Sequence, residues 1–139
     1  MKRKSNLALK RPQTISTEEK IELLKRILVD RKAEEIVILD LRKLGPVADF
    51  FVICSARSTR HVQGIAEHLL EELERRQVPY RGVEGLAEGQ WVLIDCDDVL
   101  IHIFYAPVRA HYDLEGLWSE APLERVSNSH SCEDQREDS

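Results

Sequence analysis

The stretch WVLIDCDDVLIHIF (91–104) decides the fold, because it has the pattern of two apolar strands joined by a short polar turn. Two antiparallel strands are joined most simply by a two-residue loop, and Cys96 and Asp97 fit that position. Aspartate tolerates the left-handed backbone of such turns, although less readily than glycine or asparagine. This register predicts that Asp95 faces Asp98 across the hairpin.

Alternation of side chains along the two strands gives the hairpin two different faces. One face is entirely aliphatic and is predicted to belong to the core: Val92, Ile94, Val99, Ile101 and Ile103. The other face is mixed: Trp91, Leu93, Asp95, Asp98, Leu100, His102 and Phe104. Like charges directly opposed on two strands cost up to about 1 kcal/mol. The opposed carboxylates therefore suggest a role other than folding.

Local signals on both sides of the hairpin predict helices and further strands. Ser16 and Glu19 have capping-box spacing before an amphipathic helix at 17–32. Ser58 is placed to cap a second helix at about 59–76. Three more strands and a short helical tail are predicted at 35–41, 48–56, 80–85 and 106–118. This order indicates an α/β fold, with one mixed sheet of about five strands flanked by helices.

The composition indicates one globular domain in a reducing compartment. A chain of 139 residues, 42% of them hydrophobic, is long enough for one domain with a core. No apolar run approaches the roughly 20 residues that cross a bilayer, and the start lacks the apolar stretch of a secretory signal. The cysteines form no CxxC pair, which argues against a zinc site or a disulfide framework. We therefore expect a cytoplasmic protein without cofactor or membrane contact, and with free thiols at Cys54, Cys96 and Cys132.

Charge is distributed unevenly along the chain, whose net charge is −5. The first fourteen residues carry basic and no acidic side chains, whereas residues 127–139 carry four acidic side chains and one arginine. Both ends lack apolar content, so we expect disordered tails at 1–14 and 123–139 around a domain at 15–122. An acidic body is repelled by a phosphate backbone, so the expected partner is a basic protein, with little direct RNA contact.

The mixed face of the hairpin is the candidate partner-binding site. Trp91 beside carboxylates favours binding, because exposed tryptophan is a preferred interface anchor. Asp95 and Asp98 can equally sit at a wet strand end, where they discourage edge-to-edge association. His102 is interpreted as a structural histidine. We expect Trp91, Asp95 and Asp98 to lie together at the open end of the hairpin, with secondary candidates at the neighbouring helix start: Ser58, Arg60 and His61.

The same residues also allow an enzymatic hypothesis. Asp95 and Asp97 form a DxD pattern, and CSARS (54–58) is similar to the small-residue loop of nucleotidyltransferases. Such enzymes hold two metal ions between converging carboxylates. Here Asp97 falls in the turn, no third carboxylate is evident on a neighbouring strand, and the loop lacks the glycine that a phosphate site usually needs. Metal-dependent transfer therefore remains an alternative supported by a weak signal.

Two further chemistries are disfavoured by spacing. Cys54 with His61 or His102 could suggest a thiol hydrolase, but no orienting acid follows from the sequence, so a small buried cysteine is the better interpretation. His61 and His68 are seven positions apart, which does not match the i, i+4 spacing of zinc ligands on a helix. We expect neither a catalytic residue nor a metal site.

Three segments together resemble a known family. ADFFVICSARSTRHVQGIAEHL (48–69), WVLIDCDDVLIHIF (91–104) and YDLEGLW (112–118) stand in the order and spacing of the ribosome silencing factors, also called Iojap-like proteins. The resemblance covers about residues 16–122. The sequence departs from the usual family pattern at Asp97 and Ala56, where glycine is common, and at Phe50, where tyrosine is frequent.

The resemblance implies a translational repressor that is not an enzyme. Its members bind the fourteenth protein of the large ribosomal subunit and prevent the small subunit from joining, which lowers translation when nutrients are scarce. They typically form homodimers, and their fold is related to nucleotidyltransferases without the catalysis. That relation would explain the DxD pattern. An acidic body with a tryptophan–carboxylate surface suits the basic ribosomal protein that the resemblance implies.

Overall fold

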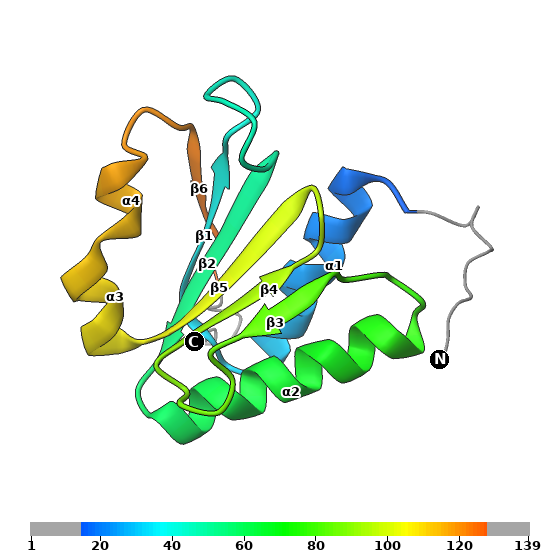
Figure 1. Ribbon diagram of the computed structural model, residues 1–139, viewed down its shortest axis with the longest axis vertical. Coiled ribbons are helices and arrows are strands. Elements are labelled where there is room, and N and C mark those ends of the chain that lie inside the picture. The colour runs from blue at the N-terminus through cyan, green and yellow to red at the C-terminus, as the bar shows by residue number, and fades with distance from the viewer. Residues whose placement is uncertain (1–14, 128–139) are drawn as a thin grey trace, which may run out of the picture.

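A six-stranded mixed sheet forms the centre of the molecule, in a computed structural model that describes residues 15–127 (Figure 1). The strands are β1 (Glu34–Asp40), β2 (Phe50–Ala56), β3 (Gly82–Glu84), β4 (Trp91–Asp95), β5 (Val99–Tyr105) and β6 (Leu123–Arg125). They lie in the order β3-β4-β5-β2-β1-β6. Only the central pair, β2 and β5, is parallel. The prediction of an α/β fold with one mixed sheet is confirmed.

Helices cover the two faces of the sheet unequally. The helices are α1 (Thr17–Asp30), α2 (Thr59–Arg75), α3 (Ala106–Tyr112) and α4 (Leu114–Leu117). The long helices α1 and α2 pack on one face and enclose the larger core, while the short helices α3 and α4 lie on the other face (Figure 1). None of the helices in residues 15–127 is long and apolar enough to cross a membrane.

Both predicted helix starts are confirmed. The Ser16 hydroxyl accepts a hydrogen bond from the Glu19 amide, and the Glu19 carboxylate accepts one from the Ser16 amide, which completes the capping box. The Ser58 hydroxyl accepts from the His61 amide at 3.0 Å and caps α2. The predicted apolar stripe of α2 is buried along its length: Val62, Ile65, Ala66, Leu69 and Leu73.

The sheet continues beyond the predicted end of the domain. Strand β6 pairs with β1 in antiparallel register, from Leu123 opposite Leu39 to Arg125 opposite Val37. Strand β6 therefore lies within the expected tail at 123–139 and brings the sheet to six strands, where the sequence predicted about five. All three β6 side chains are exposed, so the strand has no apolar pattern to reveal it. It is held by backbone pairing with β1 and by the ion pair of Glu124 with Lys25 of α1, at 2.8 Å. Residues 1–14 and 128–139 of the expected tails lie outside the described residues.

The hairpin of β4 and β5 keeps its predicted faces but not its predicted register. Asp95 faces Leu100, and the Cys96 amide donates to the Val99 carbonyl at 2.9 Å, so the two turn residues are Asp97 and Asp98. Asp97 has the left-handed backbone, with φ of 75°. Cys96 is completely buried and extends the core face instead of turning the chain.

The shift of pairing preserves the side to which each strand residue points. A change of partner by two positions keeps the alternation of faces, whereas a change by one would reverse it. The predicted aliphatic face is therefore confirmed, and its five members are completely buried: Val92, Ile94, Val99, Ile101 and Ile103. Asp95 and Asp98 do not face each other across the hairpin, because Asp98 lies in the turn and not in β5.

Candidate functional site

The mixed face of the sheet is only half covered. Helix α3 lies over β2 and β5, and the second core gathers beneath α3 and α4 around Phe51, Ile53 and Phe104. Over β4 and β3, the side chains on this face remain half-buried or exposed. We call this uncovered region the open face, and it comprises Gly82, Glu84, Trp91, Leu93, Asp95, Leu100 and Tyr112.

Trp91 is a half-buried member of an aromatic cluster. Its ring centroid lies 4.9 Å from those of both Phe104 and Tyr112, and its indole Nε1 donates to His102 Nδ1 at 3.1 Å. Tyr112 itself is 55% exposed and forms one side of the open face. The indole is therefore held in one orientation before any partner binds, which reduces the entropy lost on binding.

His102 fixes the position of the Trp91 indole by accepting its hydrogen bond at Nδ1. It is 4% exposed, and its ring centroid lies 4.5 Å from that of Phe51. Burial lowers the pKa of His102 to about 4, so the ring is neutral at neutral pH. Because Nδ1 accepts from Trp91, the proton is on Nε2, which is buried without a hydrogen-bond partner in the described structure. The location agrees with the structural role that the sequence indicated.

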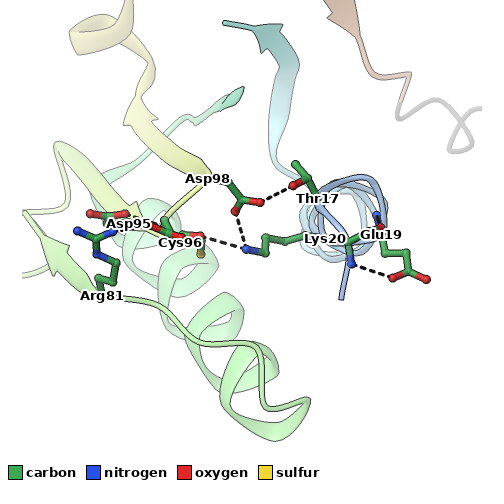
Figure 2. A network of polar contacts seen from close by, with 9 residues as sticks. Thr17, Glu19, Lys20, Arg81, Asp95, Cys96 and Asp98 are labelled. Atoms are coloured by element: carbon green, nitrogen blue, oxygen red, sulfur yellow. Dashed lines mark hydrogen bonds and ion pairs between the residues drawn. The ribbon is translucent and has the colours of Figure 1, made fainter. Parts of the chain in front are cut away.

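Asp98 lies on the other side of the hairpin from the open face. Its carboxylate accepts from Lys20 Nζ at 2.6 Å and from the Thr17 hydroxyl, both in the first turn of α1 (Figure 2). Its carbonyl accepts from the amides of Asp49 and Phe50, at 2.9 and 3.1 Å. Asp98 thus joins α1, the hairpin turn and the start of β2.

The partner of Asp98 is itself a buried charge. Lys20 is 8% exposed and donates a second hydrogen bond to the Cys96 carbonyl at 3.1 Å. Burial alone would raise the pKa of the Asp98 carboxyl, but the hydrogen bonds from Lys20 and Thr17 hold that pKa below its usual value. Internal hydrogen bonds therefore account for this carboxylate without a partner molecule.

Asp95 and Asp97 do not converge on a common point. Asp95 Oδ1 accepts from the Asp97 amide at 2.8 Å, so it caps the turn, while the Asp97 carboxylate pairs with Arg81. Within residues 15–127, no three histidine, cysteine, aspartate or glutamate side chains are grouped as metal ligands would be. The DxD pattern is a turn motif in this structure.

The predicted cluster of Trp91, Asp95 and Asp98 is not a single cluster. Trp91 begins β4 and Asp95 ends it, so the two residues are about 13 Å apart along a strand that rises 3.3 Å per residue. Both point to the open face, whereas Asp98 points to α1. The grouping is wrong because it depended on the predicted register.

The three secondary candidates lie at the first turn of α2. Ser58 is used as the helix cap, and His61 Nε2 is hydrogen-bonded to the Arg31 carbonyl at 2.9 Å. Arg60 is exposed. The Gln63 amide donates to the carbonyls of Leu86 and Ala87, at 3.1 and 2.8 Å, and so connects this turn to the loop before Trp91.

The buried cysteines lack the properties of nucleophiles. Cys54 is completely buried, and burial raises its pKa to about 12; Cys96 is also buried, with a pKa raised to about 11. Both thiols remain protonated at neutral pH, and a protonated thiol is a poor nucleophile. Cys54 is thus the small buried cysteine that the sequence indicated, and Cys132 lies outside the described residues.

Sequence reasoning missed the part of the open face contributed by β3 and α3. Gly82 and Glu84 point to the same side as Leu93 and Asp95, because Gly82 pairs with Asp95 and Glu84 with Leu93. The alternation of Gly82 and Glu84 with the inward-facing Val83 is the signal that could have revealed them. Tyr112 had no such signal, since its contact with Trp91 joins segments far apart in the chain.

The matching family model and the similar proteins agree on one family. A family model described as "Ribosomal silencing factor during starvation" matches residues 14–139. The Halalkalibacterium halodurans protein named "Ribosomal silencing factor RsfS" is 38% identical over 108 residues, which cover 78% of this chain and 92% of that protein. The Bacillus subtilis protein of the same name is 39% identical over 94 residues, 68% of this chain and 80% of that one.

Solved structures are similar over most of the chain. A crystal structure from Chromobacterium violaceum has a TM-score of 0.73 at 32% identity and covers 76% of this chain and 88% of that one. One from Bacillus halodurans has a TM-score of 0.69 at 35% identity and covers 78% and 98%. A mouse protein named "Mitochondrial assembly of ribosomal large subunit protein 1" is 30% identical over 102 residues, 71% of this chain and 45% of that protein.

The buried pair of Lys20 and Asp98 predicts strong energetic coupling. Asp98→Asn should lower the free energy of unfolding by about 3–5 kcal/mol, because it leaves a buried ammonium without a counter-charge. Adding Lys20→Met to this variant should cost less than the sum of the two single changes. Urea denaturation of the four proteins measures the coupling.

The exposed pair of Arg75 and Glu72 is the matched control, since it has the same 2.6 Å separation but an arginine side chain that is 66% exposed. We expect a much weaker coupling between Arg75→Met and Glu72→Gln, because exposed ion pairs contribute little to stability. A Lys20–Asp98 coupling no larger than this would contradict the structural role assigned to Asp98.

Proposed function

This chain belongs to the ribosomal silencing factor family, and from that membership we propose that it binds the large ribosomal subunit and prevents the small subunit from joining. Translation would fall as a result, under the nutrient limitation to which the family description refers. The proposed contact is the subunit's ribosomal protein number fourteen. The protein would act in the cytoplasm by occupying a surface, without catalysis and without a cofactor.

The open face is the observation that carries this proposal. Helices α1 and α2 cover one side of the sheet completely, whereas α3 and α4 leave Trp91, Leu93 and Leu100 half-buried on the other. An uncovered apolar surface bordered by polar residues is typical of a protein–protein interaction site. Its carboxylate, Asp95, and the net charge of −5 favour a basic protein over an RNA backbone.

Different residues would contribute to binding in different ways. Trp91 would supply the desolvated anchor, and Asp95 would pair with a cation of the ribosomal protein. Asp98 would act indirectly, because it holds the turn that presents Asp95. Ser58, Arg60 and His61 would border the interface at the Trp91 end of the hairpin. The name of the mouse relative, which refers to the ribosomal large subunit, supports the choice of subunit.

Self-association is a further part of the proposal. Tyr112 is 55% and Leu117 75% exposed, so apolar surface continues from the open face onto α4. A second copy could cover part of it in a weak homodimer. Sedimentation velocity over increasing protein concentration should show reversible dimerisation, and Leu117→Lys should weaken it. A wild-type protein that stays monomeric at high micromolar concentration would exclude the homodimer.

The proposed mechanism predicts an effect of the order of addition. Excess protein added to separated subunits should reduce the yield of joined ribosomes, because the bound protein occupies the surface that the small subunit needs. Preformed ribosomes should resist, since that surface is already covered. Sucrose-gradient profiles measure both cases. Equal loss of joined ribosomes in the two cases would contradict a steric block.

Trp91→Ala should remove co-sedimentation with purified large subunits in the absence of nucleotide and metal. Truncation of an interface tryptophan costs about 2–4 kcal/mol of binding, which lowers affinity roughly 30- to 1,000-fold. Asp95→Asn should weaken binding mainly at low salt, where exposed charges contribute most; it retains the oxygen that caps the turn.

Trp118→Ala is the matched control for the tryptophan change. Trp118 is the C-cap of α4, and its ring packs edge-on against Phe51 of β2, with 5.8 Å between centroids. Urea denaturation of both variants separates lost binding from lost folding. The site is wrong if Trp91→Ala binds normally, or if it fails to bind only to the extent that it unfolds.

A further inference from the structure

The open face extends to the edge of the sheet, where β3 adds two residues of contrasting size. Gly82 lies opposite Asp95, and Glu84 lies opposite Leu93. Both β3 residues are exposed. The strip from Glu84 across Leu93 to Asp95 is therefore a sheet surface with an acidic residue at each end, and no helix of residues 15–127 packs above it.

Glycine at position 82 is required neither by the backbone nor by packing. Its φ is not positive, and a Cβ added there would meet no heavy atom within 4 Å. Gly85, by contrast, has φ of 83°, and an added Cβ would lie 2.1 Å from the Trp91 carbonyl oxygen. Gly85 thus serves the fold, whereas Gly82 leaves open space over β3 beside Asp95.

The two carboxylates that border this space remain available to a partner. Within residues 15–127, the Glu84 carboxylate makes no hydrogen bond or ion pair, and the Asp95 carboxylate uses one oxygen to cap the turn. The nearby guanidinium of Arg81 is already paired with Asp97. Glu84 and Asp95 are diagonal neighbours on adjacent strands, a relation that places Cβ atoms about 7–8 Å apart or somewhat less.

We propose that an arginine or lysine side chain of the partner protein lies over Gly82, with its cationic end between Asp95 and Glu84. The inference rests on the proposed function and specifies the chemistry of the partner segment: a cation next to an apolar side chain that meets Trp91 and Leu100. The methylene stem of the cation covers Leu93, as long basic side chains commonly cover apolar surface. Arginine fits best, because its planar guanidinium can donate to two carboxylates at once.

A polypeptide suits this strip better than RNA does. A phosphate approaching Gly82 would meet Asp95 on one side and Glu84 on the other, and like charges repel. A basic side chain gains from both carboxylates and loses little hydration at an exposed sheet edge. The edge strand β3 therefore determines which segment of the ribosomal protein binds, while Trp91 provides the anchor.

Gly82→Phe tests the inference by filling the open space. The variant should fold with the stability of the wild type, since nothing lies within 4 Å of the new Cβ, yet its affinity for large subunits should fall about tenfold or more. Gly64→Phe is the matched control: Gly64 is exposed on α2, on the opposite side of the sheet, and also has nothing within 4 Å. It should bind as the wild type does.

Glu84→Arg tests the charge. It should weaken co-sedimentation about tenfold, with the largest loss at low salt, whereas Glu71→Arg on α2 makes the same charge change away from the open face and should have little effect. Normal binding by both Gly82→Phe and Glu84→Arg, while Trp91→Ala fails, would overturn the inference and leave the proposed function intact.

Two further results separate the possible failures. If the wild type itself does not co-sediment with large subunits, the failure lies in the proposed function and not in the inferred basic side chain over Gly82. If wild type binds protein-free ribosomal RNA, and Gly82→Phe weakens that binding, the occupant of the strip is a phosphate backbone and the inferred basic side chain is wrong. The inference is supported if the wild type binds the isolated ribosomal protein and both Gly82→Phe and Glu84→Arg weaken that binding.

Discussion

The hydrogen bonds of Asp98 are the constraint on which the arrangement of this domain depends. One residue accepts from α1 through its carboxylate and from the start of β2 through its carbonyl, while it forms half of the turn between β4 and β5. Lys20, which supplies the cation, is 78 positions away and almost completely buried. Because a buried ion pair is costly when incomplete, all three segments must be in place together. This requirement favours one arrangement of the hairpin against the first helix.

The two faces of the hairpin of β4 and β5 therefore have different roles. Its aliphatic side completes the core beneath α1 and α2, and its mixed side continues from a core beneath α3 into a surface that no helix covers. The aromatic cluster lies at the border between the two regions, where His102 and Phe104 are buried and Trp91 is half-buried. A site built on a packed sheet changes little when a partner binds, so the proposed interface would need little rearrangement on binding.

Local chemistry made much of this fold predictable, and long-range pairing made the rest unpredictable. The caps at Ser16 and Ser58 and the two faces of the hairpin follow from residue spacing alone. The register does not follow from spacing, because Cys96 and Asp97 fit a two-residue turn in sequence as well as Asp97 and Asp98 do. Long-range contacts distinguish the two, among them the pairing of Asp98 with Lys20. Strand β6 carries no apolar signal, and Tyr112 meets Trp91 only in the folded chain. Of the candidate site, Trp91 and Asp95 were placed on the right face, but their distance from each other depended on the register.

The sheet ends in unusually small edges, since β3 and β6 have three residues each. An exposed strand edge is a template on which other chains can add strands, and aggregation often begins there. Here each edge offers only a few backbone groups, so growth of the sheet from one molecule to the next gains little. An apolar face that remains exposed for the proposed partner therefore carries a smaller risk of aggregation through added strands. The short edge strands discourage contacts that extend the sheet, whereas the open face still allows contacts made through side chains.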